Sequence, residues 1–250
     1  MSHSSATGMA EDAFNYTIDG DVVRRVAIGG LLVSFSILIL PLVYVFGYYV
    51  NVMQQTIRGD DKPPVFSGDR VTERLKTGLE GLVVSIGHSI PVIVLAGGIV
   101  VGIALTVLGG TTEGAPGMTG SVLVIMALIG SGVMLVGSLY LGLVIPAGML
   151  LYADTGRISA AFSPSELKEV ILVKPYLIAY LFSAVLLTAA GVVGGIVGLI
   201  PFVGFLFIGF FQFPAIVASY RMFTLAVIES SYSLESSNDS QVVDATGDVQ

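Results

Sequence analysis

Four long stretches of this chain contain no Asp, Glu, Lys or Arg: residues 26–57, 81–112, 114–153 and 175–220. A helix that crosses a bilayer needs about 20 predominantly apolar residues, and every stretch exceeds that length. Inside hydrocarbon the backbone must satisfy its own hydrogen bonds, so such stretches are expected to be helical. Charged residues make up only 12% of the chain, against about 25% in a typical soluble protein. The sequence therefore predicts an all-α, polytopic integral membrane bundle.

We expect about five spans, six at most, at residues 26–50, 82–108, 121–150, 176–199 and 202–227. Pro41, Pro146 and Pro214 lie within these helices, and each removes a backbone donor and favours a kink. The first stretch is long, because 32 helical residues would extend about 48 Å against a hydrocarbon core of about 30 Å. It is either a kinked helix that runs on into the headgroup region or a broken, re-entrant helix.

Acidic segments flank this membrane domain. Residues 1–21 carry four acids and residues 229–250 carry five, with no Lys or Arg in either. Such tails are expected to be solvated and disordered. The domain between them, residues 22–228, has 11 basic and nine acidic residues and a charge of +2.

Two amphipathic helices are expected at the membrane interface. In the first, over residues 69–82, apolar side chains recur at Val71, Leu75, Leu79 and Leu82, and charges occupy the other positions. The second begins at a capping box, Ser163 to Glu166, with Pro164 at its first position.

The order proline, apolar helix, polar loop, amphipathic segment and span occurs twice, and this predicts an internal repeat. Pro41 begins the first unit and Pro146 the second, and Phe66-Ser67 matches Phe162-Ser163. A partial third copy contains Pro214.

Glycines inside the spans predict close helix contacts rather than a nucleotide-binding loop, which would need a preceding strand. They have GxxxG or similar spacing and are Gly98, Gly102, Gly191, Gly194, Gly195 and Gly198.

His88 is the only histidine within a predicted span. An ionisable residue inside the membrane is a candidate for function, although a neutral histidine packed between helices explains it equally well. One histidine cannot form a metal site alone, and the chain has no cysteine. We therefore predict no catalytic residue, metal site or cofactor, and the absence of a basic, aromatic surface argues against nucleic acid as a partner.

Three segments resemble archaeal membrane proteins of domain of unknown function 4013: "IGGLL" (28–32), "FGYYVNVMQQTIRGDDKPPVF" (46–66) and "LKTGLEGLVVSIGHSIP" (75–91). The resemblance covers about residues 20–228, and it departs from the family at "SGDRV" (67–71). The family is abundant in haloarchaea, which would fit the acidic tails. The resemblance implies no established activity, so it assigns no site residue.

The function expected from these features is that of an accessory or transport-related membrane component without its own catalysis. A small-solute transporter or channel is the alternative, and an enzyme acting on lipid is a third. The partners expected are the lipid bilayer and either another membrane protein or a second copy of the chain. The positive-inside rule predicts a plasma-membrane protein whose long basic loops and C-terminal tail are cytoplasmic. Five spans would place the N-terminal tail outside, whereas Arg24 and Arg25 favour the inside.

Overall fold

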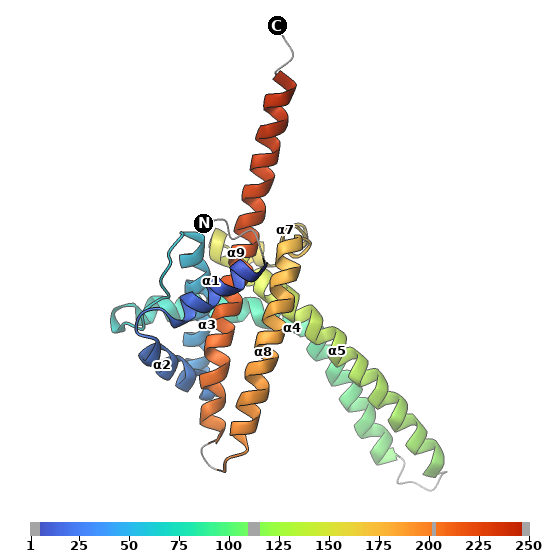
Figure 1. The fold of residues 1–250 in the computed structure, drawn as a ribbon. Coiled ribbons are helices and arrows are strands. Elements are labelled where there is room, and N and C mark those ends of the chain that lie inside the picture. Colours follow the sequence, from blue (N-terminus) through green and yellow to red (C-terminus); the bar gives the residue numbers. More distant parts are fainter. Residues whose placement is uncertain (1–5, 110–115, 202–203, 247–250) are drawn as a thin grey trace.

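The computed structural model describes residues 6–109, 116–201 and 204–246, and the elements assigned there are helical (Figure 1). In chain order they are α1 (Ala6–Ile18), α2 (Val22–Ser34), α3 (Ile39–Ile57), the 3-10 turn η1 (Gly68–Arg70), α4 (Val71–Gly109), α5 (Pro116–Thr155), α6 (Ile158–Ala161), α7 (Pro164–Ile171), α8 (Lys174–Gly198) and α9 (Gly204–Thr246).

Four of these helices are long and apolar enough to cross a membrane: α4, α5, α8 and α9. They form two hairpins, α4–α5 and α8–α9, which are joined by α6 and α7. The prediction of about five spans is therefore not confirmed among the described residues. The span expected at 26–50 accounts for the difference, because it is divided between α2 and α3.

The break between α2 and α3 covers Phe35 to Leu38, and Leu38 has an extended backbone. Pro41 lies in the first turn of α3, three residues after this break. In a continuous helix its ring would collide with the carbonyl of Ile37, and the helix ends before that collision arises. Pro41 thus lies beside a break, whereas Pro146 and Pro214 are inside continuous helices, α5 and α9.

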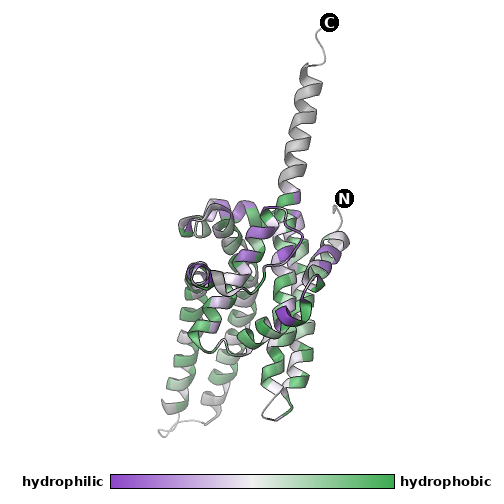
Figure 2. Cartoon of the chain, turned by 90° about the vertical axis from the view of Figure 1, so that its left-hand side faces the viewer, coloured by the Kyte–Doolittle hydropathy of each residue, from purple (hydrophilic) through white to green (hydrophobic). Residues whose placement is uncertain are grey.

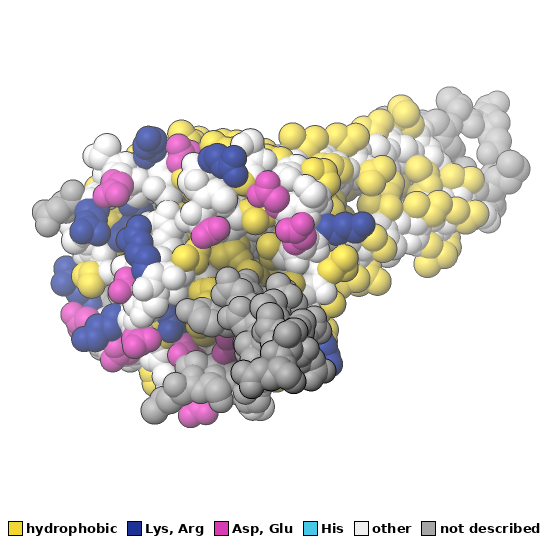
Figure 3. All heavy atoms as spheres, turned by 90° about the horizontal axis from the view of Figure 1, so that it is seen from above, with side chains coloured by type: hydrophobic (Ala, Val, Ile, Leu, Met, Phe, Trp, Pro, Cys, Tyr) yellow, Lys and Arg dark blue, Asp and Glu magenta, His cyan; other side chains and the backbone are white. Residues whose placement is uncertain are grey.

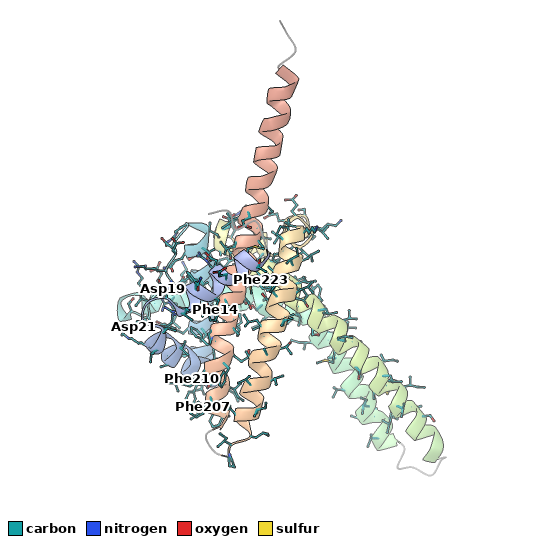
Figure 4. The ribbon with its side chains drawn as sticks, in the orientation of Figure 1. Phe14, Asp19, Asp21, Phe207, Phe210 and Phe223 are labelled. Carbon is teal, nitrogen blue, oxygen red and sulfur yellow. The ribbon has the colours of Figure 1, made fainter. Side chains whose placement is uncertain are left out.

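α2 and α3 both pack along α9 and run in opposite directions. The Ser34 hydroxyl, at the end of α2, donates to the carbonyl of Leu206, near the start of α9. At the other end of α3, Thr56 accepts a hydrogen bond from Arg221. Figure 4 shows that Asp19 and Asp21, which precede α2, lie well above Phe207 of α9. Both ends of the α2–α3 pair therefore lie at the same end of the bundle.

Helices are assigned in part of both predicted tails, and the disorder of these tails stays a prediction. Residues 6–18 form α1, in which Met9, Ala13 and Tyr16 are buried at helical spacing and pack on the core. α9 continues to Thr246, because no glycine or proline interrupts the chain between Pro214 and Gly247. Residues 1–5 and 247–250 lie outside the described residues.

The two predicted amphipathic segments differ in form. Residues 71–82 are not a separate helix, since they begin α4 and continue directly into its span. α7 is separate and has Ser163 at its N-cap, but the serine side chain makes no capping hydrogen bond. The apolar side of α7 packs on the protein core through Val170, so it does not face lipid as predicted.

The first two units of the predicted repeat share a local feature. α3 and α5 are each followed closely by a glycine with positive φ, Gly59 at 79° and Gly156 at 67°. In each unit the phenylalanine that follows then stacks on a ring, Phe66 on Tyr48 and Phe162 on His88. The repeat itself stays a prediction.

The bundle has a polar end and two diverging apolar hairpins (Figures 1 and 2). Lys, Arg, Asp and Glu side chains gather at the polar end, while the projecting α4–α5 hairpin is covered with hydrophobic side chains (Figure 3). The core lies where the hairpins meet and includes Tyr48, Tyr49, Met149, Phe213 and Tyr220.

Candidate functional site

A buried arginine joins several elements at the polar end. Arg221 of α9 is 4% exposed, and its Nε lies 2.9 Å from Oδ1 of Asp12 in α1. Its Nη1 donates to the carbonyl of Asp60 (2.7 Å) and to the Thr56 hydroxyl (3.3 Å). The guanidinium carbon also lies 4.4 Å from the centre of the Tyr16 ring. Because its charge is balanced within the chain, this cluster is best explained as a structural clamp.

Burial raises the pKa of Tyr16, and the positive charges of Arg221 and Arg25 act in the opposite direction by lowering this pKa. Arg25 is itself buried, and it donates to the carbonyls of Thr17 and Asp19 at the end of α1. These contacts fix α1 against the start of α2.

An apolar cavity of about 430 Å³ lies where the hairpins diverge. α2, α3, α5, α8 and α9 all contribute to its lining, which is mostly aliphatic and aromatic. Ser183, in the lining, follows Lys174 by nine residues, which corresponds to about 14 Å along α8. The cavity is therefore well below the polar end. We call it the central cavity.

Two residues in the lining of the central cavity have hydroxyl groups that make no hydrogen bond. They belong to Tyr49 of α3 and Ser183 of α8, and both oxygen atoms are buried. A third hydroxyl in the lining, that of Tyr220, donates to the Met149 sulfur at 3.2 Å. An apolar cavity with a few polar groups is the usual form of a small-molecule site. An unpaired buried hydroxyl is costly, and a side-chain rotation that turned either one into the cavity would let a ligand acceptor pair with it.

His88 lies outside the central cavity, in a closely packed position on α4. It is 5% exposed, and its ring stacks on Phe162 with centroids 4.7 Å apart. Nδ1 lies 2.9 Å from the carbonyl of Val84, one turn earlier. The neighbouring Ser85 and Ser89 hydroxyls donate to helix carbonyls. These contacts explain His88 as a packed residue, and a functional role for it stays a prediction.

The predicted packing glycines divide into two groups. An added Cβ at Gly194 would lie 3.4 Å from the Ile208 backbone, and Gly198 and Gly191 also face side chains of α9. At Gly102 it would meet Met126 of α5. Gly98 and Gly195 have no such neighbour within 4 Å in the part of the chain that the structure describes.

The closest helix crossing involves glycines that the sequence analysis missed. A Cβ at Gly78 of α4 would lie 1.8 Å from the Val43 carbonyl oxygen, and one at Gly47 of α3 would lie 2.1 Å from that of Arg74. Gly29 and Gly30 of α2 are similarly close to Phe213 and Phe210. Gly47 and Gly78 belong to different helices, so glycine spacing within one helix cannot identify this crossing.

The described residues contain no group of three His, Cys, Asp or Glu side chains that could hold a metal ion. This part of the chain does provide a polar end joined by the contacts of Arg221 and an apolar cavity lined by two residues with unpaired hydroxyls. Such an arrangement is suited to binding.

Comparison with known proteins gives one match. The model of a family described as "Protein of unknown function (DUF4013)" matches residues 31–202, which is more than half of the chain. No curated protein and no solved structure matches it. The matched region contains α3, α4, α5 and α8, and with them most of the central cavity. This chain belongs to the DUF4013 family.

Proposed function

We propose that this protein is a transport-related membrane component, without catalysis of its own, that binds an amphipathic small molecule in the central cavity. The observation that carries the proposal is the pair of unpaired hydroxyls, of Tyr49 and Ser183, behind a mostly apolar lining. A ligand with an apolar body and one polar acceptor would satisfy both parts of the site. α5 and α8 diverge from each other (Figure 1), and residues of both helices line the cavity.

The test is binding of a dansyl-labelled fatty acid to the purified protein in maltoside micelles. Tyr49→Phe and Ser183→Ala remove the hydroxyls with little change in side-chain volume. A net hydrogen bond is worth about 1 kcal/mol, so each variant should bind about fivefold more weakly. Neither should lose thermal stability, since neither hydroxyl has a partner within the chain.

Tyr48→Phe is the matched control. The Tyr48 hydroxyl is also buried and unpaired, but it does not line the central cavity. It should leave binding unchanged. Equal affinity in all three variants and the parent would refute a role for the hydroxyls, and no saturable binding to the parent would refute the proposal. If the parent binds the probe, transfer of the probe between protein-containing vesicles would identify a transporter that acts alone.

The alternative is an accessory protein that pairs with another membrane protein, or with a second copy, through the α4–α5 hairpin. The most apolar part of each helix in this hairpin is almost wholly unburied within the chain, with 0% of its residues buried in α4 and 6% in α5. Gly98 of α4 and Gly132 of α5 also have open space beside them, where another helix could approach closely. Cysteines at these two positions test this, because the chain has no others. A disulfide-linked dimer in native membranes would favour self-association.

We further propose that the polar end faces the cytoplasm of the cell. All 11 Lys and Arg residues lie in segments at this end, and residues 110–115 and 199–203, which connect the helices of the two hairpins, include none. The positive-inside rule then supports a cytoplasmic location for the long loops and both terminal segments.

A further inference from the structure

A second cavity, of about 380 Å³, lies at the polar end between α3 and the start of α4. Its lining includes Arg58, Arg70 and Arg74, together with one acidic residue, Glu73. The amide side chains of Asn51, Gln54 and Gln55 complete its α3 wall. We call it the arginine pocket, and its charged lining residues sum to +2.

Arg74 is the least exposed of the three arginines, at 3%. Its Nη1 and Nη2 donate to the Tyr44 hydroxyl and the Val65 carbonyl, both at 3.0 Å. Its Nε is buried and makes no hydrogen bond. The guanidinium carbon lies 5.2–5.5 Å from the centres of three aromatic rings, which belong to Tyr44, Tyr48 and Phe66.

The contrast with Arg221 is informative, because that buried arginine has Asp12 at 2.9 Å. No carboxylate among the described side chains forms an ion pair with Arg74. The aromatic rings offset part of the cost of burying its charge, but they supply no counter-charge. A buried cation without an anionic partner is unfavourable, so an anion in the pocket would complete the site.

Two further features favour an anion. The first turn of α4 contributes Glu73 and Arg74 to the lining, so the positive end of the helix dipole lies beside the pocket. Arg58 and Arg70 are exposed and can close on a ligand, and arginine pairs with phosphate through two parallel hydrogen bonds. The three amides can donate to the remaining oxygens.

We propose that the arginine pocket binds a phosphate-type oxyanion at the membrane interface. Val71 and Leu79, near the start of α4, are exposed and apolar, so lipid can surround this part of the helix. The phosphate can therefore come from a phospholipid headgroup or from solution. This site is separate from the central cavity, and it does not depend on the function proposed for that cavity.

The experiment uses the full chain in a maltoside detergent, which contains no phosphate. Inorganic phosphate and short-chain phosphatidylglycerol are titrated separately, and binding is measured by calorimetry. Arg58→Gln and Arg70→Gln are the test variants, because both residues are exposed and their loss should not unfold the protein. Arg157→Gln is the control, since it removes the same charge from an exposed site at the polar end that does not line this pocket.

The parent and Arg157→Gln should bind at least one probe with equal affinity. Arg58→Gln and Arg70→Gln should each bind about tenfold more weakly, as expected for loss of a charge-assisted hydrogen bond. Binding of phosphatidylglycerol alone would identify the lipid headgroup as the source, and binding of both probes in competition would identify phosphate in general. The proposal is overturned if neither probe binds, or if the two test variants bind as tightly as Arg157→Gln.

Discussion

Loss of the Asp12 charge should destabilise the polar end, because Arg221 would remain buried without its nearest counter-charge. Arg221 is 4% exposed and Asp12 19%, and their atoms are 2.9 Å apart. Breaking a buried ion pair from one side costs about 3 kcal/mol or more. Asp61 is also within 4 Å of Arg221, but it is 92% exposed, and an exposed pair contributes about 0–1 kcal/mol.

We therefore expect Asp12→Asn to cost about 3 kcal/mol and Asp61→Asn to cost less than about 1 kcal/mol. Thermal unfolding in maltoside micelles measures the global effect. Limited proteolysis within residues 6–18 measures the local effect, since the loss of this contact can release α1 before the bundle unfolds. Glu11→Gln is the control, because Glu11 is an exposed neighbour on the same helix. If Asp12→Asn and Glu11→Gln behave alike in both assays, Arg221 is not held by Asp12 and the clamp is refuted.

Three other predictions follow from helix packing and topology. Gly78→Ala should destabilise the bundle by about 3 kcal/mol or more, because the added Cβ would overlap the Val43 carbonyl. Gly98→Ala is the control: its Cβ meets no neighbour, so it should leave the melting temperature unchanged. Gly194→Leu should lower the melting temperature and Gly195→Leu should not, since only Gly194 contacts α9, and equal effects would contradict the α8–α9 packing. Single cysteines can be placed at Asn15, Glu113, Arg157 and Asn238 and labelled in intact cells with an impermeant maleimide. Only the cysteine at position 113 should react.

The four long helices could be predicted from the sequence because charge is excluded from hydrocarbon whatever the tertiary structure. α1 was missed because its acids dominated the composition. Its apolar residues Met9, Ala13 and Tyr16 nevertheless recur at helical spacing, and that pattern was available as a signal. Arg74 likewise lies among the charges of the amphipathic helix predicted over residues 69–82. It shares a second stripe with Gly78 and Gly81, and this stripe is the buried one.

The central cavity could not have been predicted. Tyr49 and Ser183 lie on different helices far apart in the chain, and neither stands in a recognisable motif. They line one cavity only because the helices pack together around a shared core, which includes Met149 and Phe213 and is not encoded by any local sequence pattern. Unpaired hydroxyls are likewise a property of the folded structure alone.

The number of spans and the side of the N-terminal segment are one question. Five spans require the two ends of the chain to lie on opposite sides, and that assignment conflicts with Arg24 and Arg25. A helix of 13 residues such as α2 extends only about 20 Å, which is too short to cross a core of about 30 Å. The break before Pro41 lets the chain turn back, and the small residues Gly29 and Gly30 let α2 lie close against α9. With four crossings both ends lie on one side, and Arg24 and Arg25 join the other basic residues there without conflict.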